Sequence, residues 1–321
     1  MIKYSNPENE SNKIIFKEKS LKKLVSIWNS FNIDDTISFN QNINITYKNL
    51  NKKLRHICGN NKYWFWTNII ERLANKQLYN DESKLLKIKR DLKTISRDNF
   101  RPEKPESWYK NPKTWLSNYD IQNVMFQYEK AKHYKYRFLG VFPIDFSVMD
   151  YTGNCLYSEI CKIDIQKLID KKFKFIGLIT NLDKHNEPGS HWTSTILIID
   201  PKLKTYGAYY YDSTSHAVPK YLSNFIENVK QQCDKLYPEN DFKITVNKKK
   251  HQYKNSECGV FSMLFQIRWI NKHIVKKNNT SFDEIIGNPF INDDKMLEIR
   301  DYLFRPNAKI ELAKKIKKYN L

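Results

Sequence analysis

The stretch from Gln252 to Met263 constrains this 321-residue chain more than any other. A polar loop leads to Cys258, and an apolar run follows in which Val260, Leu264 and Ile267 recur at helical spacing. The spacing predicts that Cys258 lies at the start of a buried helix. Unpaired backbone N–H groups and the positive end of the helix dipole favour a thiolate there. The alternative is an inert cysteine, because free cysteines are often fully buried.

A cysteine nucleophile needs a base, and the base needs a group that orients it. His191 stands just before an apolar run, 194 to 199, that is typical of a buried strand. After a turn at Pro201, a second strand begins near Tyr206 and ends at Asp212. Two strands joined by a tight turn predict a hairpin, in which Asp212 comes alongside His191.

The residues around the cysteine suggest two further roles. Gln252 precedes Cys258 by six positions, and its amide could donate to an oxyanion beside the Cys258 backbone N–H. Gly259 would let a substrate backbone come close. Each residue type also has an ordinary explanation, since a lone histidine at a strand edge is more often structural and a strand-ending aspartate is more often a turn residue. Four suitable residue types in a suitable order nevertheless favour catalysis.

Three other histidines compete with His191 for the role of base. They are His185 in the polar loop before the strand, His216 in an expected turn, and His251 beside the glutamine. We rank His191 above them because its strand and hairpin context fits the role.

The pattern of these motifs resembles that of the Ulp-type SUMO proteases. It consists of His191-Trp192, a strand that ends in Asp212-Ser213, and Gln252 followed after five residues by Cys-Gly-Val-Phe. Relatives of this family are the adenovirus protease and the core-polyprotein proteases of large DNA viruses, including poxviruses and African swine fever virus. The segment from Trp115 to Ile121 is similar to the Trp-Leu-x-Asp/Asn-x-x-Ile segment that opens the family's protease domain. Glu257 departs from the pattern, because many cellular members have Asp before the cysteine.

The resemblance extends from Trp115 to Ile274, about half the chain. It implies a papain-like, Ulp-type α+β core with a central mixed sheet flanked by helices, and a preference for small residues, usually glycine, before the cut. It also implies a set of site residues: His191 as base, Asp212 as its partner, Cys258 as nucleophile, Gln252 as oxyanion donor, and Trp192, Gly259 and Trp115 as substrate-binding residues.

Hydrophobic periodicity predicts the organisation of the chain. From Phe173 onward the order is strand, strand, strand, helix, strand and nucleophile helix, which is typical of an α+β domain. Upstream, helical spacing in 21–31, 63–73 and 83–94 predicts a helical N-terminal region, with Trp64 and Trp66 as core or interface residues rather than a stacking platform for nucleic acid. Prolines 102 and 105 mark a linker. We therefore expect residues 1-104 to form the helical region and residues 105-321 a Ulp-like protease domain with a basic C-terminal tail.

Charge and cysteine content restrict the partners and the compartment. Lys and Arg number 55 against 35 Asp and Glu, a net charge of +20, which permits non-specific DNA binding. The basic residues are spread along the chain, so we favour a compositional origin in an AT-rich genome. The five cysteines have no metal-ligand spacing, so we expect free thiols in a reducing compartment and neither metal nor cofactor. No apolar run suits a membrane span or a secretory signal, and we expect an intracellular protein.

These observations leave two classes of function. The first is a cysteine endopeptidase that cleaves viral structural or core polyproteins after small residues such as glycine, in the virion and in the viral factory of the host cytoplasm. Within this class, the alternative is a deconjugating protease for a SUMO- or ubiquitin-like modifier. The second class is a non-catalytic basic virion or DNA-binding protein with a vestigial triad. The AT-rich composition and the N-terminal extension favour a large DNA virus.

Overall fold

The computed structural model describes residues 16–30, 33–58, 82–275, 280–287, 291–307 and 310. The chain forms two compact units, one of which contains residues 111–303, while the other contains the described residues up to 110 and those from 304 onward. The helix expected over 63–73 and the basic tail at 314–318 lie outside the described residues. The division into functional domains at 104 and 105 stays a proposal.

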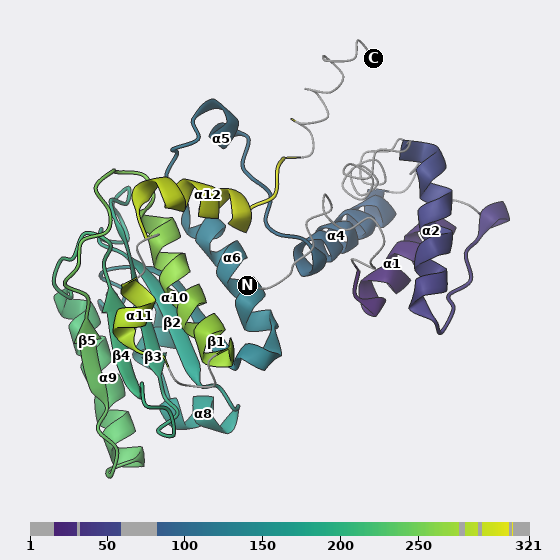
Figure 1. Ribbon diagram of the computed structural model, residues 1–321. Coiled ribbons are helices and arrows are strands. Elements are labelled where there is room, and N and C mark those ends of the chain that lie inside the picture. Colours follow the sequence, from purple (N-terminus) through teal and green to yellow (C-terminus); the bar gives the residue numbers. More distant parts are fainter. Residues whose placement is uncertain are drawn as a thin grey trace. The chain divides into compact units, whose positions relative to one another are not determined.

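The N-terminal unit is helical, and its helices pack through one apolar core (Figure 1). Its elements are α1 (Glu18–Asn29), a 3-10 turn (Ile33–Asp35), α2 (Ile43–Cys58), α4 (Glu82–Asn99) and α5 (Ser107–Lys110). Leu21, Leu24 and Trp28 lie on the buried face of α1, as their spacing predicts. The chain returns to this unit at Phe304, whose ring packs edge-on against Trp108 at a centroid distance of 4.8 Å.

The second unit is built on a five-stranded mixed sheet, which confirms the predicted α+β fold class. Its strands are β1 (Tyr136–Pro143), β2 (Phe175–Asn181), β3 (Trp192–Ile198), β4 (Gly207–Tyr211) and β5 (Lys243–Val246), in that spatial order. The pairs β1–β2 and β4–β5 are parallel, and the two central pairings are antiparallel. The hairpin expected from the sequence is therefore β3 and β4, with Ser194 opposite Tyr211.

Helices surround this sheet because its central strands are buried on both faces (Figure 1). They are α6 (Asn118–Lys130), a 3-10 turn (Lys132–Tyr134), α7 (Ser158–Cys161), α8 (Ile165–Asp170), α9 (Lys220–Leu236), α10 (Cys258–Val275), α11 (Phe282–Ile286) and α12 (Asp293–Leu303). Leu178, Leu197 and Tyr210 share an apolar core with α9. The alternate positions on the same strands face α10, where the Tyr211 ring stacks on Phe265 at 4.8 Å. Among the described residues, no helix is long and apolar enough to cross a membrane.

A buried hydrogen-bond network fixes α10 on the sheet. The Gln266 amide nitrogen donates to the Leu178 carbonyl oxygen and to Ser194 Oγ, each at 2.9 Å, while the Tyr136 hydroxyl donates to the amide oxygen. Gly177 makes room for this amide, because a Cβ at 177 would collide with it and with the tyrosine hydroxyl. These contacts set the rotation of α10 and hence the position of its first residue, Cys258.

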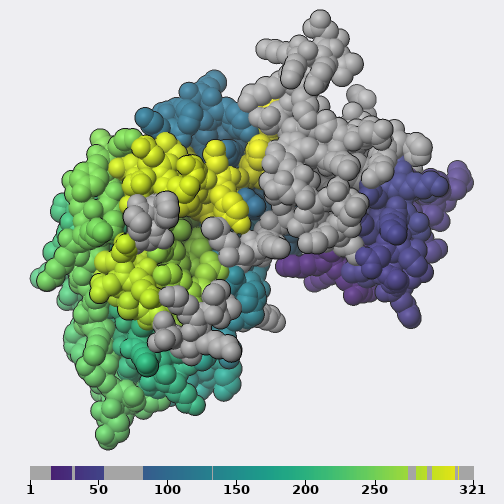
Figure 2. All heavy atoms as spheres, viewed as in Figure 1, coloured from purple at the N-terminus to yellow at the C-terminus, as the bar shows by residue number. Residues whose placement is uncertain are grey.

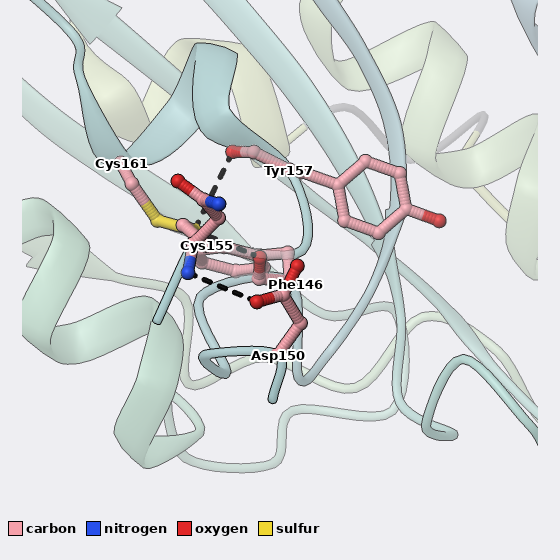
Figure 3. The surroundings of a disulfide bond; sticks show 6 residues. Phe146, Asp150, Cys155, Tyr157 and Cys161 are labelled. Atoms are coloured by element: carbon pink, nitrogen blue, oxygen red, sulfur yellow. Dashed lines mark hydrogen bonds between the residues drawn. A yellow bond between two sulfur atoms is a disulfide. The ribbon is translucent and has the colours of Figure 1, made fainter. Parts of the chain in front are cut away.

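The expectation that all cysteines are free is wrong for one pair, because Cys155 and Cys161 form a disulfide (Figure 3). The Tyr157 N–H donates to the Phe146 carbonyl oxygen at 3.2 Å, and α7 then turns the chain back until the two Cα atoms lie 6.5 Å apart. A spacing of six residues in sequence does not reveal this reversal. Cys233 and Cys258 are free and buried.

Candidate active site

The structure brings Cys258, His191 and Asp212 together at one end of the central strands. Cys258 is the first residue of α10, His191 precedes β3 by one residue, and Asp212 follows β4 by one. His191 Nε2 lies 2.8 Å from Asp212 Oδ1. The other ring nitrogen, Nδ1, takes no part in this hydrogen bond, and the Cys258 thiol lies near enough to the ring to raise its pKa. This is the order of groups that activates a thiol nucleophile.

The electrostatics of the site favour a protonated imidazole. Burial alone would lower the pKa of His191, but the hydrogen bonds and charges of Asp212 and Cys258 outweigh it and raise the pKa to about 9. Burial would likewise raise the pKa of Asp212, yet hydrogen bonds from His191 and Thr214 hold it below its ordinary value. The imidazole and the carboxylate therefore form a charged pair at neutral pH.

Two residues that the sequence analysis missed hold Asp212 in place. Thr214 donates to Asp212 Oδ1 through its backbone N–H at 2.7 Å and its hydroxyl at 2.6 Å. Asn247, just after β5, accepts the Asp212 N–H at 2.8 Å and donates to its carbonyl oxygen at 2.9 Å. The Asp-Ser-Thr sequence is a turn signal that could have identified Thr214, whereas nothing local to Asn247 links it to a residue 35 positions away.

Gln252 lies buried in the loop before α10, with its amide oriented by neighbours. Its Oε1 accepts from Ser213 Oγ at 2.6 Å, and its Nε2 donates to the Lys254 carbonyl oxygen at 2.6 Å. Because an amide nitrogen carries two N–H groups, one donor remains beyond the contact with Lys254. The role of Gln252 as an oxyanion donor stays a prediction.

Trp192 and Gly259 form one packed wall beside the nucleophile. The Trp192 indole N–H donates to the Leu116 carbonyl oxygen at 3.0 Å, and Ser262 Oγ donates to the Trp192 carbonyl oxygen at 3.0 Å. A Cβ at Gly259 would lie 3.0 Å from the Leu116 side chain and 3.3 Å from the Trp192 ring. Close packing thus explains why a residue without a side chain stands at position 259. The contact of Gly259 with a substrate backbone stays a prediction.

Leu116 and Trp192 of this wall also line a cleft of about 390 Å³. Trp115, Trp192, Phe142 and Tyr157 supply aromatic surface, and the loop 181–189 supplies its polar side. Trp115 is 48% exposed, which leaves its ring available to a ligand. The cleft is therefore suited to an extended segment with apolar side chains.

The competing histidines occupy different positions. His185 lies in the cleft loop, where its Nδ1 is 2.7 Å from Oδ2 of the buried Asp145. His216 is exposed, with Nδ1 3.3 Å from Asp212 Oδ2. His251 is buried against the Tyr211 hydroxyl, and burial lowers its pKa. In the part of the chain that the structure describes, no cluster of three or more His, Cys, Asp or Glu side chains is suited to hold a metal ion.

Comparisons with known proteins point to one group of enzymes. The chain is 35% identical over 190 residues to a thiol protease of Acanthamoeba polyphaga mimivirus, covering 58% of this chain and 57% of the relative. It is 24% identical over 203 residues to a cysteine protease of African swine fever virus, covering 59% of this chain and 67% of the relative. No protein-family model matches.

A solved structure shares the fold. The crystal structure of the African swine fever virus protease aligns with a TM-score of 0.57 and 18% identity, over 93% of this chain and 94% of that one. At this identity the likeness establishes the fold. The sequence match to the mimivirus protease spans less than two thirds of that relative's length.

Proposed function

We propose that this chain is a Ulp-like cysteine endopeptidase, because its sequence is similar to those of the cysteine proteases of African swine fever virus and mimivirus. The observation that carries the proposal is the hydrogen-bond contact of 2.8 Å between His191 and Asp212, in a place where the nearby Cys258 thiol also raises the pKa of the ring. A vestigial site would not need a buried, charged His–Asp pair beside a buried cysteine, because such a pair is costly without a function.

The proposed reaction begins from a thiolate–imidazolium pair, in which the protonated ring of His191 already holds the proton given up by the Cys258 thiol. The thiolate attacks the peptide carbonyl carbon, and the oxyanion accepts hydrogen bonds from the Cys258 N–H and the Gln252 amide, each typically worth about 2.7–4 kcal/mol. The intermediate collapses as His191 gives its proton to the leaving amine, which leaves a thioester. Water attacks the thioester, His191 takes a proton from the water, and the carboxylic acid product and the thiol are released.

The packed wall supports a preference for small residues at the cut. Trp192, Leu116 and Gly259 are in contact with one another, so a substrate residue that passes them has little space for a side chain. We propose that the chain cleaves after small residues, with glycine the first choice, and that Trp115 contacts the neighbouring substrate residues. Structural polyproteins of a large DNA virus are the proposed substrates, cleaved in the virion or the viral factory.

The alternative substrate is a conjugate of a SUMO-like modifier, since several African swine fever virus relatives carry the name SUMO-1 cysteine protease. Cleavage of a peptide library and of an intact SUMO-type conjugate, each with the Cys258→Ala variant as the inactive control, separates the two. Cleavage of peptides after Gly without release of the modifier supports the polyprotein substrate. Failure to cleave either substrate, with the Cys258 thiol intact, would overturn the proposed function.

A further inference from the structure

A buried ion pair adjoins the proposed nucleophile. Glu257 immediately precedes Cys258, and its Oε1 lies 3.2 Å from Nη1 of Arg300 on α12. Both side chains are almost inaccessible, with exposures of 1% and 2%. Burial raises the pKa of Glu257, whereas Arg300 opposes this shift. The proposed reaction uses neither group.

Arg300 also contacts the segment that precedes Leu116. Its Nη2 donates to the carbonyl oxygen of Thr114, two residues before Leu116. Leu116 in turn accepts the Trp192 indole N–H and packs on Gly259. One guanidinium thus connects the start of the nucleophile helix to the segment that forms the wall of the cleft. Only a planar group with several diverging donors makes both contacts at once.

The two halves of this connection come from distant parts of the chain. Arg300 lies 43 positions from Glu257 and 186 from Thr114. The helix that carries it, α12, packs against α10, and its outer side forms part of the surface (Figures 1 and 2). The Arg300 side chain therefore extends from a helix at the surface toward the first turn of α10.

We propose that Arg300 is a positioning residue, which fixes the separation between Cys258 and the Leu116 wall by holding Glu257 and Thr114 at the same time. This inference rests on the proposed protease function. The Glu257 carbonyl oxygen accepts the Phe261 N–H at 3.0 Å as part of the first helical turn, so restraining Glu257 restrains the backbone that carries the thiol. A small displacement of a nucleophile is sufficient to reduce turnover by about 100-fold.

The test separates positioning from stability with four variants: Arg300→Met, Arg300→Lys, Glu257→Gln, and the double variant Glu257→Gln/Arg300→Met. Lys295→Met, which removes an exposed cation from the same helix, is the matched control. Thermal unfolding, kcat and KM on a peptide substrate, and the rate at which iodoacetamide alkylates Cys258 are measured for each.

We expect Arg300→Met to lower Tm and to reduce kcat at least tenfold, with KM changed less than threefold. In the double variant no buried charge is left unpaired, so Tm should recover, whereas kcat should stay at least tenfold low because the Thr114 contact is still missing. Arg300→Lys keeps the charge opposite Glu257 but lacks the second donor arm, and should behave like the double variant. The control should match the unmodified protein.

Recovery of kcat together with Tm, in either the double variant or Arg300→Lys, would show a purely structural role and overturn the inference. If Arg300→Met does not fold, these two variants still decide the question. Absence of peptide cleavage by the unmodified protein would count against the proposed function instead. The alkylation rate then provides the separate test, since a slower rate in folded Arg300→Lys supports positioning and an unchanged rate refutes it.

Discussion

Asp212→Asn removes the negative charge that faces His191 but keeps a side-chain oxygen that can accept a hydrogen bond from the Nε2–H group. The pKa of His191, about 9 against an ordinary 6.5, corresponds to about 3 kcal/mol in favour of the imidazolium, at about 1.4 kcal/mol per pH unit. An opposite charge at hydrogen-bond distance typically accounts for about 1 to 3 pH units of such a shift. We therefore expect the pKa of His191 in the variant to fall to between about 6 and 8.

The imidazolium must protonate the leaving amine, so its pKa sets the alkaline limit of kcat/KM. At pH 8, a fall of the pKa from about 9 to between about 8 and 6 reduces the protonated fraction by about 2- to 100-fold. The assay is a pH profile of kcat/KM on a peptide substrate. His216→Asn is the control, because this exposed ring also lies 3.3 Å from Asp212 but takes no part in the proposed reaction. An alkaline limit that stays in place in Asp212→Asn would refute the reasoning.

Stability gives a second measurement of the same coupling. A raised pKa in the folded state stabilises the protein fully below pH 6.5, and this contribution is lost as pH rises through about 9. The free energy of unfolding should thus fall by up to about 3 kcal/mol over that range in the unmodified protein, and by less in Asp212→Asn. Equal slopes in both proteins would contradict the assigned cause of the shift.

Three further predictions follow from other features. Iodoacetamide should label Cys258 faster than Cys233, whose pKa burial raises to about 11, and faster labelling of Cys233 would contradict the assignment of the nucleophile. Gly177→Ala should lower the free energy of unfolding in urea by about 1–3 kcal/mol, because the added methyl group collides with the Gln266 amide; an unchanged midpoint would show that the amide can move. The net charge of +20 should give DNA binding that weakens as the salt concentration rises. If DNA acts by bringing enzyme and substrate together, it should accelerate cleavage of a basic protein more than cleavage of a short peptide. Equal acceleration of both substrates would indicate that DNA activates the enzyme itself.

Local sequence patterns predicted most of the unit that contains residues 111–303, because its elements have strong periodicity. The apolar run after His191 became β3, the pattern that ends at Asp212 became β4, and α10 begins at Cys258. Two strands that a tight turn connects pair with each other in the antiparallel direction. The approach of His191 to Asp212 could therefore be inferred from the sequence.

The sequence analysis missed contacts that form only where the chain folds back on itself. The Cys155–Cys161 disulfide forms because α7 reverses the chain, and composition alone indicated free thiols. Asn247 supports Asp212 from the end of β5, which depends on the parallel pairing of β4 with β5. Parallel pairing is set by the long connection between the strands, including α9, and leaves no turn signal in the sequence.

The structure offers a physical reason for Glu257, the residue that departs from the pattern of the resembled family. From the sequence, it is a glutamate where many relatives of the resembled family have aspartate, and no further inference was possible. In the structure its carboxylate is buried and lies 3.2 Å from Arg300, on a helix outside the segment that resembles the family. A buried carboxylate needs a partner, so the glutamate and the arginine are expected to depend on each other. Substituting either one alone should therefore lower Tm more than substituting both, which a pattern of single positions cannot reveal.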